Sequence, residues 1–108
     1  MNKIQTGKLW MKAGDNKTFT LTLIQDDEPL IFNGIATVYI ANQDELVLIK
    51  EVELVNGVIE LTITKEDKLP KGVYDIEIYV EELDQTFPEE YYLQLVVNKS
   101  LLSRMVNN

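Results

Sequence analysis

Hydrophobic and polar residues alternate along most of the chain. In the stretch Thr18–Leu23, apolar side chains occupy one face and threonines occupy the other. The stretch Tyr74–Glu81 repeats the pattern, with apolar side chains on one face and mainly acidic ones on the other. Side chains on one face of a β-strand recur every two residues, and regular alternation is typical of antiparallel sheets with one solvated face. The pattern therefore predicts β-strands rather than helices.

Seven stretches carry this pattern, and turn-forming residues separate them. They are Lys8–Lys12, Thr18–Leu23, Ala36–Asn42, Leu46–Leu54, Val58–Thr64, Tyr74–Glu81 and Tyr91–Val97. Many short strands with regular turn signals are typical of a β-sandwich. The length of 108 residues fits a single domain. We therefore expect an all-β protein, an antiparallel immunoglobulin-like β-sandwich of about seven strands over residues 1–98.

The dipeptide Asn56-Gly57 lies between two alternating stretches and predicts a type I′ hairpin, because that turn needs positive φ at two successive residues. A two-residue loop pairs Val55 with Val58 and, further from the turn, Glu53 with Glu60. Directly opposed carboxylates would cost about 0.2–1 kcal/mol. Such a pair could bind a cation or share a proton, but on an exposed hairpin we expect both side chains to turn into solvent.

The pattern changes after the last predicted strand, in residues 99–108. Apolar residues there follow the spacing of one face of a helix, and Ser100 could cap it. These residues are Leu101, Leu102, Met105 and Val106. A helix this short is marginal in isolation. The segment is therefore either a frayed tail or the start of a helix or linker that packs against another subunit.

The charges are unevenly distributed along a chain of net charge −8. The stretch Asp75–Glu90 is strongly acidic and contains no basic residue, whereas the N-terminal region is basic, with Lys3, Lys8, Lys12 and Lys17. An acidic surface repels phosphate, so neither nucleic acid nor an anionic membrane is an expected partner. The acidic stretch is either a solvated surface or a docking face for a basic partner, including the basic end of a neighbouring copy.

Residues that commonly carry chemistry are missing. The sequence contains no histidine and no cysteine, which excludes a Ser-His-Asp triad, a Cys-His dyad and ordinary zinc sites. It has no glycine-rich phosphate loop, and Asp26-Asp27-Glu28 lacks the spacing of a calcium loop. We therefore expect no enzyme activity, no cofactor and no metal. The polar N-terminus and the lack of a long apolar run also predict a soluble protein without a signal peptide.

The aromatic residues are either core residues or a binding surface. Trp10 lies between two apolar neighbours, and we expect it in the core. Tyr79 is on the polar side of its strand, and of the adjacent Tyr91 and Tyr92 one should face outward. An exposed tyrosine pair could anchor a protein contact or stack on a sugar, although packing across strands explains the tyrosines equally well. The candidate interaction surface comprises Tyr79, Tyr91, Tyr92, Leu101, Leu102, Met105 and Val106.

The order of several short segments resembles the N-terminal domain of baseplate upper proteins from phages of Gram-positive bacteria. The resemblance covers about residues 8–98 and is carried by Ala13-Gly14-Asp15, Glu28–Gly34, Asn56–Ile59 and Leu69–Tyr74, with the strands between them. Within the last segment, Gly72-Val73-Tyr74 enters a late strand, as in many immunoglobulin-like domains where the tyrosine hydroxyl ties down the preceding turn.

This resemblance implies a structural role in the virion. Such domains attach to the central baseplate of the tail and carry receptor-binding proteins, and a helical or linker region follows the sandwich. We therefore expect a virion structural protein, assembled in the cytoplasm of the bacterial host, that binds other phage tail or baseplate proteins. Its C-terminal tail could also join copies into a homo-oligomer. The alternative is a carbohydrate-binding or adhesive β-sandwich module of a bacterial surface protein.

Overall fold

The computed structural model describes residues 1–101, which form ten strands and two short 3₁₀ segments. The 3₁₀ segments are η1 (Lys65–Asp67) and η2 (Glu81–Leu83). The strands are β1 (Asn2–Gln5), β2 (Leu9–Lys12), β3 (Lys17–Gln25), β4 (Glu28–Pro29), β5 (Gly34–Asn42), β6 (Glu45–Val55), β7 (Val58–Ile63), β8 (Gly72–Val80), β9 (Gln85–Phe87) and β10 (Leu93–Asn98). The all-β prediction is confirmed, and all seven predicted strands are present with shifted ends.

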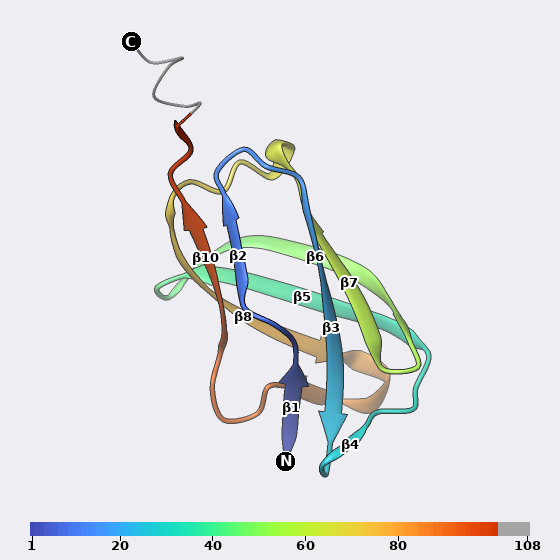
Figure 1. Ribbon diagram of the computed structural model, residues 1–108. Helices are drawn as coiled ribbons and strands as arrows, with labels where there is room; N and C mark the ends of the chain where they lie inside the picture. Colours follow the sequence, from blue (N-terminus) through green and yellow to red (C-terminus); the bar gives the residue numbers. More distant parts are fainter. Residues whose placement is uncertain (102–108) are drawn as a thin grey trace.

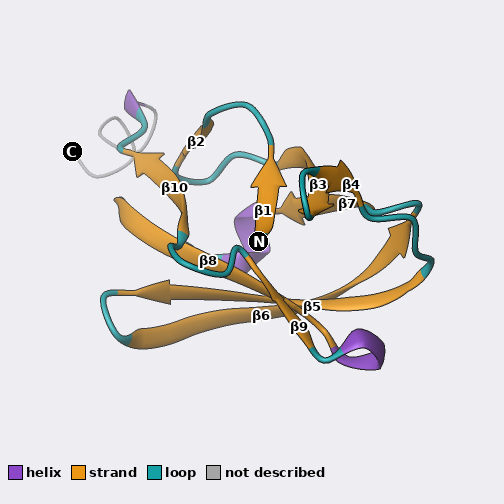
Figure 2. Ribbon diagram, turned by 90° about the horizontal axis from the view of Figure 1, so that it is seen from below, coloured by secondary structure: helices purple, strands orange, loops and turns teal. Residues whose placement is uncertain are grey.

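The strands form one curled sheet in the order β1-β3-β7-β6-β5-β8-β10-β2, with β4 beside β3 and β9 beside β8. Figures 1 and 2 show that β3 and β7 face β5, β6 and β8 across the interior. The expectation of a wholly antiparallel sheet is wrong, because β2 runs parallel to β10, with Leu9 beside Leu95. After β1, which pairs with β3, the chain crosses to the opposite edge of the sheet and forms β2, which runs in the same direction as β10.

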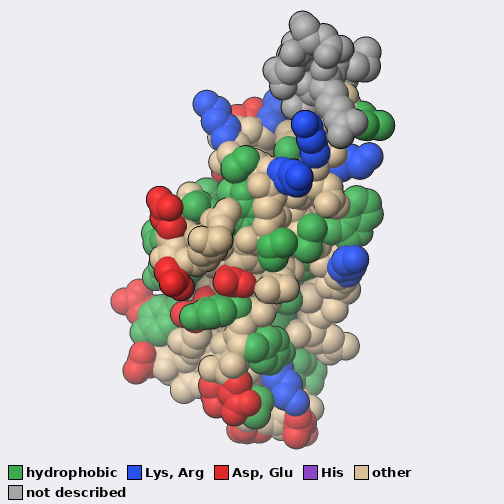
Figure 3. All heavy atoms as spheres, turned by 90° about the vertical axis from the view of Figure 1, so that its left-hand side faces the viewer, with side chains coloured by type: hydrophobic (Ala, Val, Ile, Leu, Met, Phe, Trp, Pro, Cys, Tyr) green, Lys and Arg blue, Asp and Glu red, His purple; other side chains and the backbone are tan. Residues whose placement is uncertain are grey.

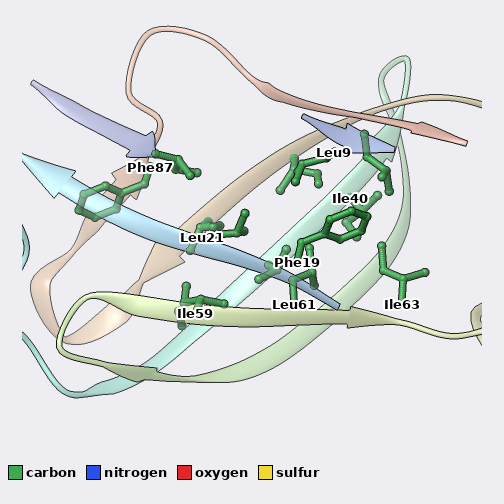
Figure 4. Packing of buried hydrophobic residues seen from close by; sticks show 14 of the residues in the cluster. Leu9, Phe19, Leu21, Ile40, Ile59, Leu61, Ile63 and Phe87 are labelled. Carbon is green, nitrogen blue, oxygen red and sulfur yellow. The ribbon is translucent and has the colours of Figure 1, made fainter. Parts of the chain in front are cut away.

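The core lies inside the curl of the sheet, where the apolar members of the alternating stretches meet. Leu21 of β3, Ile40 of β5 and Leu61 of β7 are fully buried, and Figure 4 shows them directed into the same interior. Phe87 of the unpredicted strand β9 joins them and is also fully buried. Burying a side chain of this size contributes about 1.5–3 kcal/mol, so the alternating pattern accounts for much of the driving force for folding.

The predicted turn at Asn56-Gly57 is confirmed by positive φ angles of 48° and 77°. Val55 pairs with Val58, as the two-residue loop requires. Asn56 is exposed, but Gly57 is buried. The Gly57 nitrogen donates to the carbonyl oxygen of Phe32, and the Leu23 nitrogen donates to the carbonyl oxygen of Gly57, at 3.1 and 2.8 Å. These bonds join the hairpin to β3 and to the segment that leads into β5.

The predicted pairing of Glu53 with Glu60 is wrong, because the β6–β7 ladder ends two pairs from the turn. Beyond that point β6 pairs with β5 and β7 pairs with β3, so the two strands diverge (Figure 1). Glu53 lies opposite Ile35, and Glu60 lies opposite Thr20. Each carboxylate therefore faces an uncharged neighbour, and the expected repulsion across the ladder is avoided.

Tyr74 fixes the turn that precedes β8. Its side chain is 1% exposed, and its hydroxyl donates to the backbone carbonyl oxygen of Pro70. Burial raises the pKa of the Tyr74 phenol, against a hydrogen bond with Asn42 that lowers it. The hydrogen bond expected from the Gly-x-Tyr motif is therefore present.

We expect Tyr74→Phe to lower the free energy of unfolding by about 1 kcal/mol, because the Pro70 carbonyl loses its partner while the aromatic ring stays in the core. Urea denaturation at neutral pH measures the change. Tyr39→Phe is a matched control, since Tyr39 is half-buried and its hydroxyl forms no hydrogen bond with residues 1–101. A loss no larger than that of the control would contradict a stabilising role of the hydroxyl.

Candidate interaction surface

The outer face of β6, β5 and β8 carries a row of side chains that mixes apolar and acidic groups. Tyr39 of β5 lies between Ile49 of β6 and Glu77 of β8 in the paired register. Ile49 is 55% exposed, and the other two side chains are half-buried. Leu46 and Val47, near the start of β6, are exposed as well. An exposed group of large apolar side chains beside carboxylates is typical of a protein contact surface.

Tyr91 and Tyr92 lie next to this face, in the loop before β10. They line a surface hollow of about 160 Å³. The residues around it are Glu77, Pro88, Glu89, Glu90, Tyr91 and Tyr92. The expectation that only one tyrosine faces outward is wrong, since both are about half exposed. The reason is that β10 begins at Leu93, so the alternation of a strand does not apply to the two tyrosines.

Tyr79 lies two residues from Glu77 on the same face of β8. Its hydroxyl donates to Oδ1 of Asp84 at 2.7 Å. This hydrogen bond, together with desolvation and the nearby negative charges, raises the pKa of the Tyr79 phenol. The hydroxyl is therefore engaged within the chain, while the half-buried ring borders the outer face. The structure thus brings Tyr79, Tyr91 and Tyr92 to the same region.

The C-terminal part of the predicted surface is elsewhere. Leu101 is 68% exposed and follows β10, whereas Tyr92 precedes it. Six strand residues at about 3.3 Å each separate the two positions by roughly 20 Å. Leu102, Met105 and Val106 lie outside the described residues, as does most of the predicted tail 99–108. The tyrosines and Leu101 therefore do not form one continuous patch.

Trp10 is not a core residue, and that expectation is wrong. Leu9 and Met11 point inward, so strand alternation places Trp10 on the outer face, where it is 44% exposed. It lies beside Val96 of β10, which in turn lies beside the exposed Val73 of β8. The Lys17 ammonium is 5.3 Å from the centre of the Trp10 ring, a cation–π contact. Alternation within β2 was the signal that could have identified this second apolar cluster.

A second hollow, of about 410 Å³, opens where β6 and β7 diverge. Glu53, Val55, Val58 and Glu60 line it. Glu53 belongs to β6 and Glu60 to β7, and both side chains are exposed. Within residues 1–101 there is no group of three or more side chains that could hold a metal ion. Because both side chains are exposed, we interpret Glu53 and Glu60 as solvated surface residues.

Comparisons with known proteins assign neither a family nor a function to the chain. No protein-family model matches the sequence, and no curated protein matches it. In the part of the chain that the structure describes, no helix is long and apolar enough to span a membrane.

Proposed function

We propose that this chain is a structural protein of a bacteriophage tail or baseplate, which joins other tail components by protein–protein contacts. The observation that carries the proposal is the order of the segments between residues 8 and 98, which resembles that of phage baseplate upper proteins. The Tyr74 hydroxyl bonded to the Pro70 carbonyl supports it, because this hydrogen bond belongs to the last of those segments. The work of such a protein would be to hold partners in place, and we propose no catalytic role.

In this proposal the curled sheet is an immunoglobulin-like sandwich. One layer would contain β1, β3 and β7, and the other would contain β6, β5, β8, β10 and β2. The tyrosine that ties down the turn before β8 supports this interpretation, since it is a recurring feature of such domains. The outer face of the second layer would then be the contact surface, because it carries Trp10, Ile49 and the hollow beside Tyr91 and Tyr92.

A carbohydrate-binding or adhesive module is the second candidate. The two exposed tyrosines favour it, because they lie beside carboxylates in a shallow hollow. An aromatic ring offers an apolar face to a sugar ring, and carboxylates accept hydrogen bonds from its hydroxyls. Binding of the purified chain to a glycan array, and its loss in Tyr91→Ala, would favour this candidate over the first.

Detection of the chain in virions tests the proposed function. We expect antibodies against the purified chain to label one end of the tail in immunogold electron micrographs of purified phage encoded by the same genome. Mass spectrometry of the same particles should identify its peptides. Virions stripped of their tails by fractionation provide the control and should not be labelled. Purified particles that contain no peptide of this chain would contradict the proposal.

A further inference from the structure

Lysine side chains gather at one end of the folded molecule. Two hydrogen bonds and one strand pairing assemble this end. The Ala13 nitrogen donates to the Asn98 oxygen, the Lys65 nitrogen donates to Oδ1 of Asn16, and Lys17 pairs with Ile63. The lysine-rich end comprises Lys12, Lys17, Lys65, Lys68, Lys71 and Lys99. Figure 3 shows most of the blue side chains of this face gathered at that end.

Carboxylates dominate the opposite end. The β3–β4 turn, η2 and the loop after β9 contribute Asp26, Asp27, Glu28, Glu81, Glu82, Asp84, Glu89 and Glu90. The Asn2 nitrogen donates to Oε1 of Glu89 at 3.2 Å, and the Met1 amine contacts Asp26 at 3.1 Å, so β1 holds two of these elements together. Among residues 1–101, the only lysine at this end is Lys3, which lies 3.8 Å from Asp27. The surplus of negative charge at this end is therefore not neutralised by the chain itself.

We propose that the chain associates head to tail with a second copy of itself, the lysine-rich end of one copy binding the hollow beside Tyr91 and Tyr92 of the next. The hollow combines three carboxylates, from Glu77, Glu89 and Glu90, with two exposed aromatic rings. A lysine ammonium is the group that such a site accepts, through ion pairs and cation–π contacts. The Lys17 ammonium over the Trp10 ring is an example of the second contact within one copy.

The occupant is a second copy because the molecule presents both complementary surfaces, one at each end of β10. Two different surfaces meet in such a contact, so it is heterologous and adds further copies instead of closing as a pair. Each exposed ion pair contributes about 0–1 kcal/mol, and salt screens it, so the association should be weak and sensitive to ionic strength. This inference is independent of the proposed virion role and requires only the charges and the hollow.

Sedimentation velocity of the full chain over a range of concentrations tests the proposal. In about 10 mM salt, where the Debye length is about 30 Å, we expect the sedimentation coefficient to rise steadily with concentration. In about 1 M salt, where the Debye length is about 3 Å, the monomer value should return. A monomer at every concentration in low salt would overturn the proposal, and the acidic hollow would then belong to a basic partner of another kind.

Charge reversal identifies the surfaces. Lys65→Glu with Lys71→Glu at the lysine-rich end, and Glu77→Lys with Glu90→Lys at the hollow, should each abolish association. An equimolar mixture of the two variants should associate again, since each then supplies the surface that the other lost. Glu51→Lys with Glu53→Lys changes the net charge by the same amount as the hollow variant but leaves both ends intact, and it should associate like the unaltered chain. Association that survives in either end variant, or that the mixture does not restore, would refute the assigned surfaces.

Discussion

Gly57→Ala should lower the free energy of unfolding by about 3 kcal/mol or more. A methyl group at Gly57 would lie 2.1 Å from the carbonyl oxygen of Leu30, which is backbone and cannot move aside as a side chain would. Overpacking of this kind costs about 1–3 kcal/mol, and the positive φ of 77° adds about 1–2 kcal/mol for a residue with a Cβ. Urea denaturation followed by circular dichroism measures the loss.

Gly14→Ala is the matched control for this prediction. Gly14 also has a positive φ, of 90°, but a methyl group there would meet nothing within 4 Å. The control should therefore show only the backbone cost of about 1–2 kcal/mol. If Gly57→Ala destabilised the protein no more than Gly14→Ala does, the contact between the turn and Leu30 would be unimportant for stability.

The Asn56-Gly57 turn illustrates what the sequence can reveal about this fold. A type I′ turn is a local property of two residues, so the dipeptide predicted its position and conformation. The burial of Gly57 against Leu30 and Phe32 depends on the path of the segment that leads into β5, which no local pattern encodes. The pairing of Val55 with Val58 follows from the turn itself and could be derived, whereas the divergence of β6 and β7 further from the turn could not.

The strands that the sequence did not predict lack the alternating pattern. In β1 the buried position Asn2 is polar, and only Ile4 is an apolar core residue. Asn2 is 4% exposed because its side-chain nitrogen donates to Oε1 of Gln85 at 2.7 Å and to the Thr86 carbonyl oxygen at 3.1 Å. These partners come from β9, more than 80 positions away. A buried polar group is predictable only once its partners are known.

The candidate surface was predictable in part. Tyr91 and Tyr92 were selected by residue type, and both are exposed, but their place beside Glu77 depends on the neighbouring strand β8. Trp10 was assigned to the core because it lies between two apolar neighbours, although the alternation of Leu9 and Met11 indicated the opposite face. The lysine-rich end joins residues from four separate segments, so it appears only in the folded chain.

An ion pair holds η1, which follows β7, against β6. The Lys50 ammonium lies 2.8 Å from Oδ2 of Asp67, and both side chains are largely buried. The same oxygen accepts a hydrogen bond from the Thr64 nitrogen, also at 2.8 Å. Burial of Asp67 alone would raise its pKa, but the hydrogen bonds from Lys50 and Thr64 outweigh it and lower the pKa of this carboxyl.

We expect Asp67→Asn to lower the free energy of unfolding by about 1–2 kcal/mol at pH 7, because the charge that Lys50 and Thr64 stabilise is lost. A carboxyl whose pKa is lower in the folded than in the unfolded chain stabilises the fold above its unfolded pKa, near 3.8. That contribution disappears as the pH falls through the folded pKa. The difference in stability between the unaltered chain and the variant should therefore be constant above about pH 5 and shrink below about pH 4.

Urea denaturation at several pH values between about 2 and 7 checks this dependence. Lys50→Met provides the second arm of a double-mutant cycle, because it keeps the length of the side chain and removes its charge. Since the two residues act on one oxygen, the double variant should lose less stability than the two single variants lose together. Additive losses, or a difference that persists unchanged at pH 2, would show that Asp67 stabilises the fold through its shape and not through its charge.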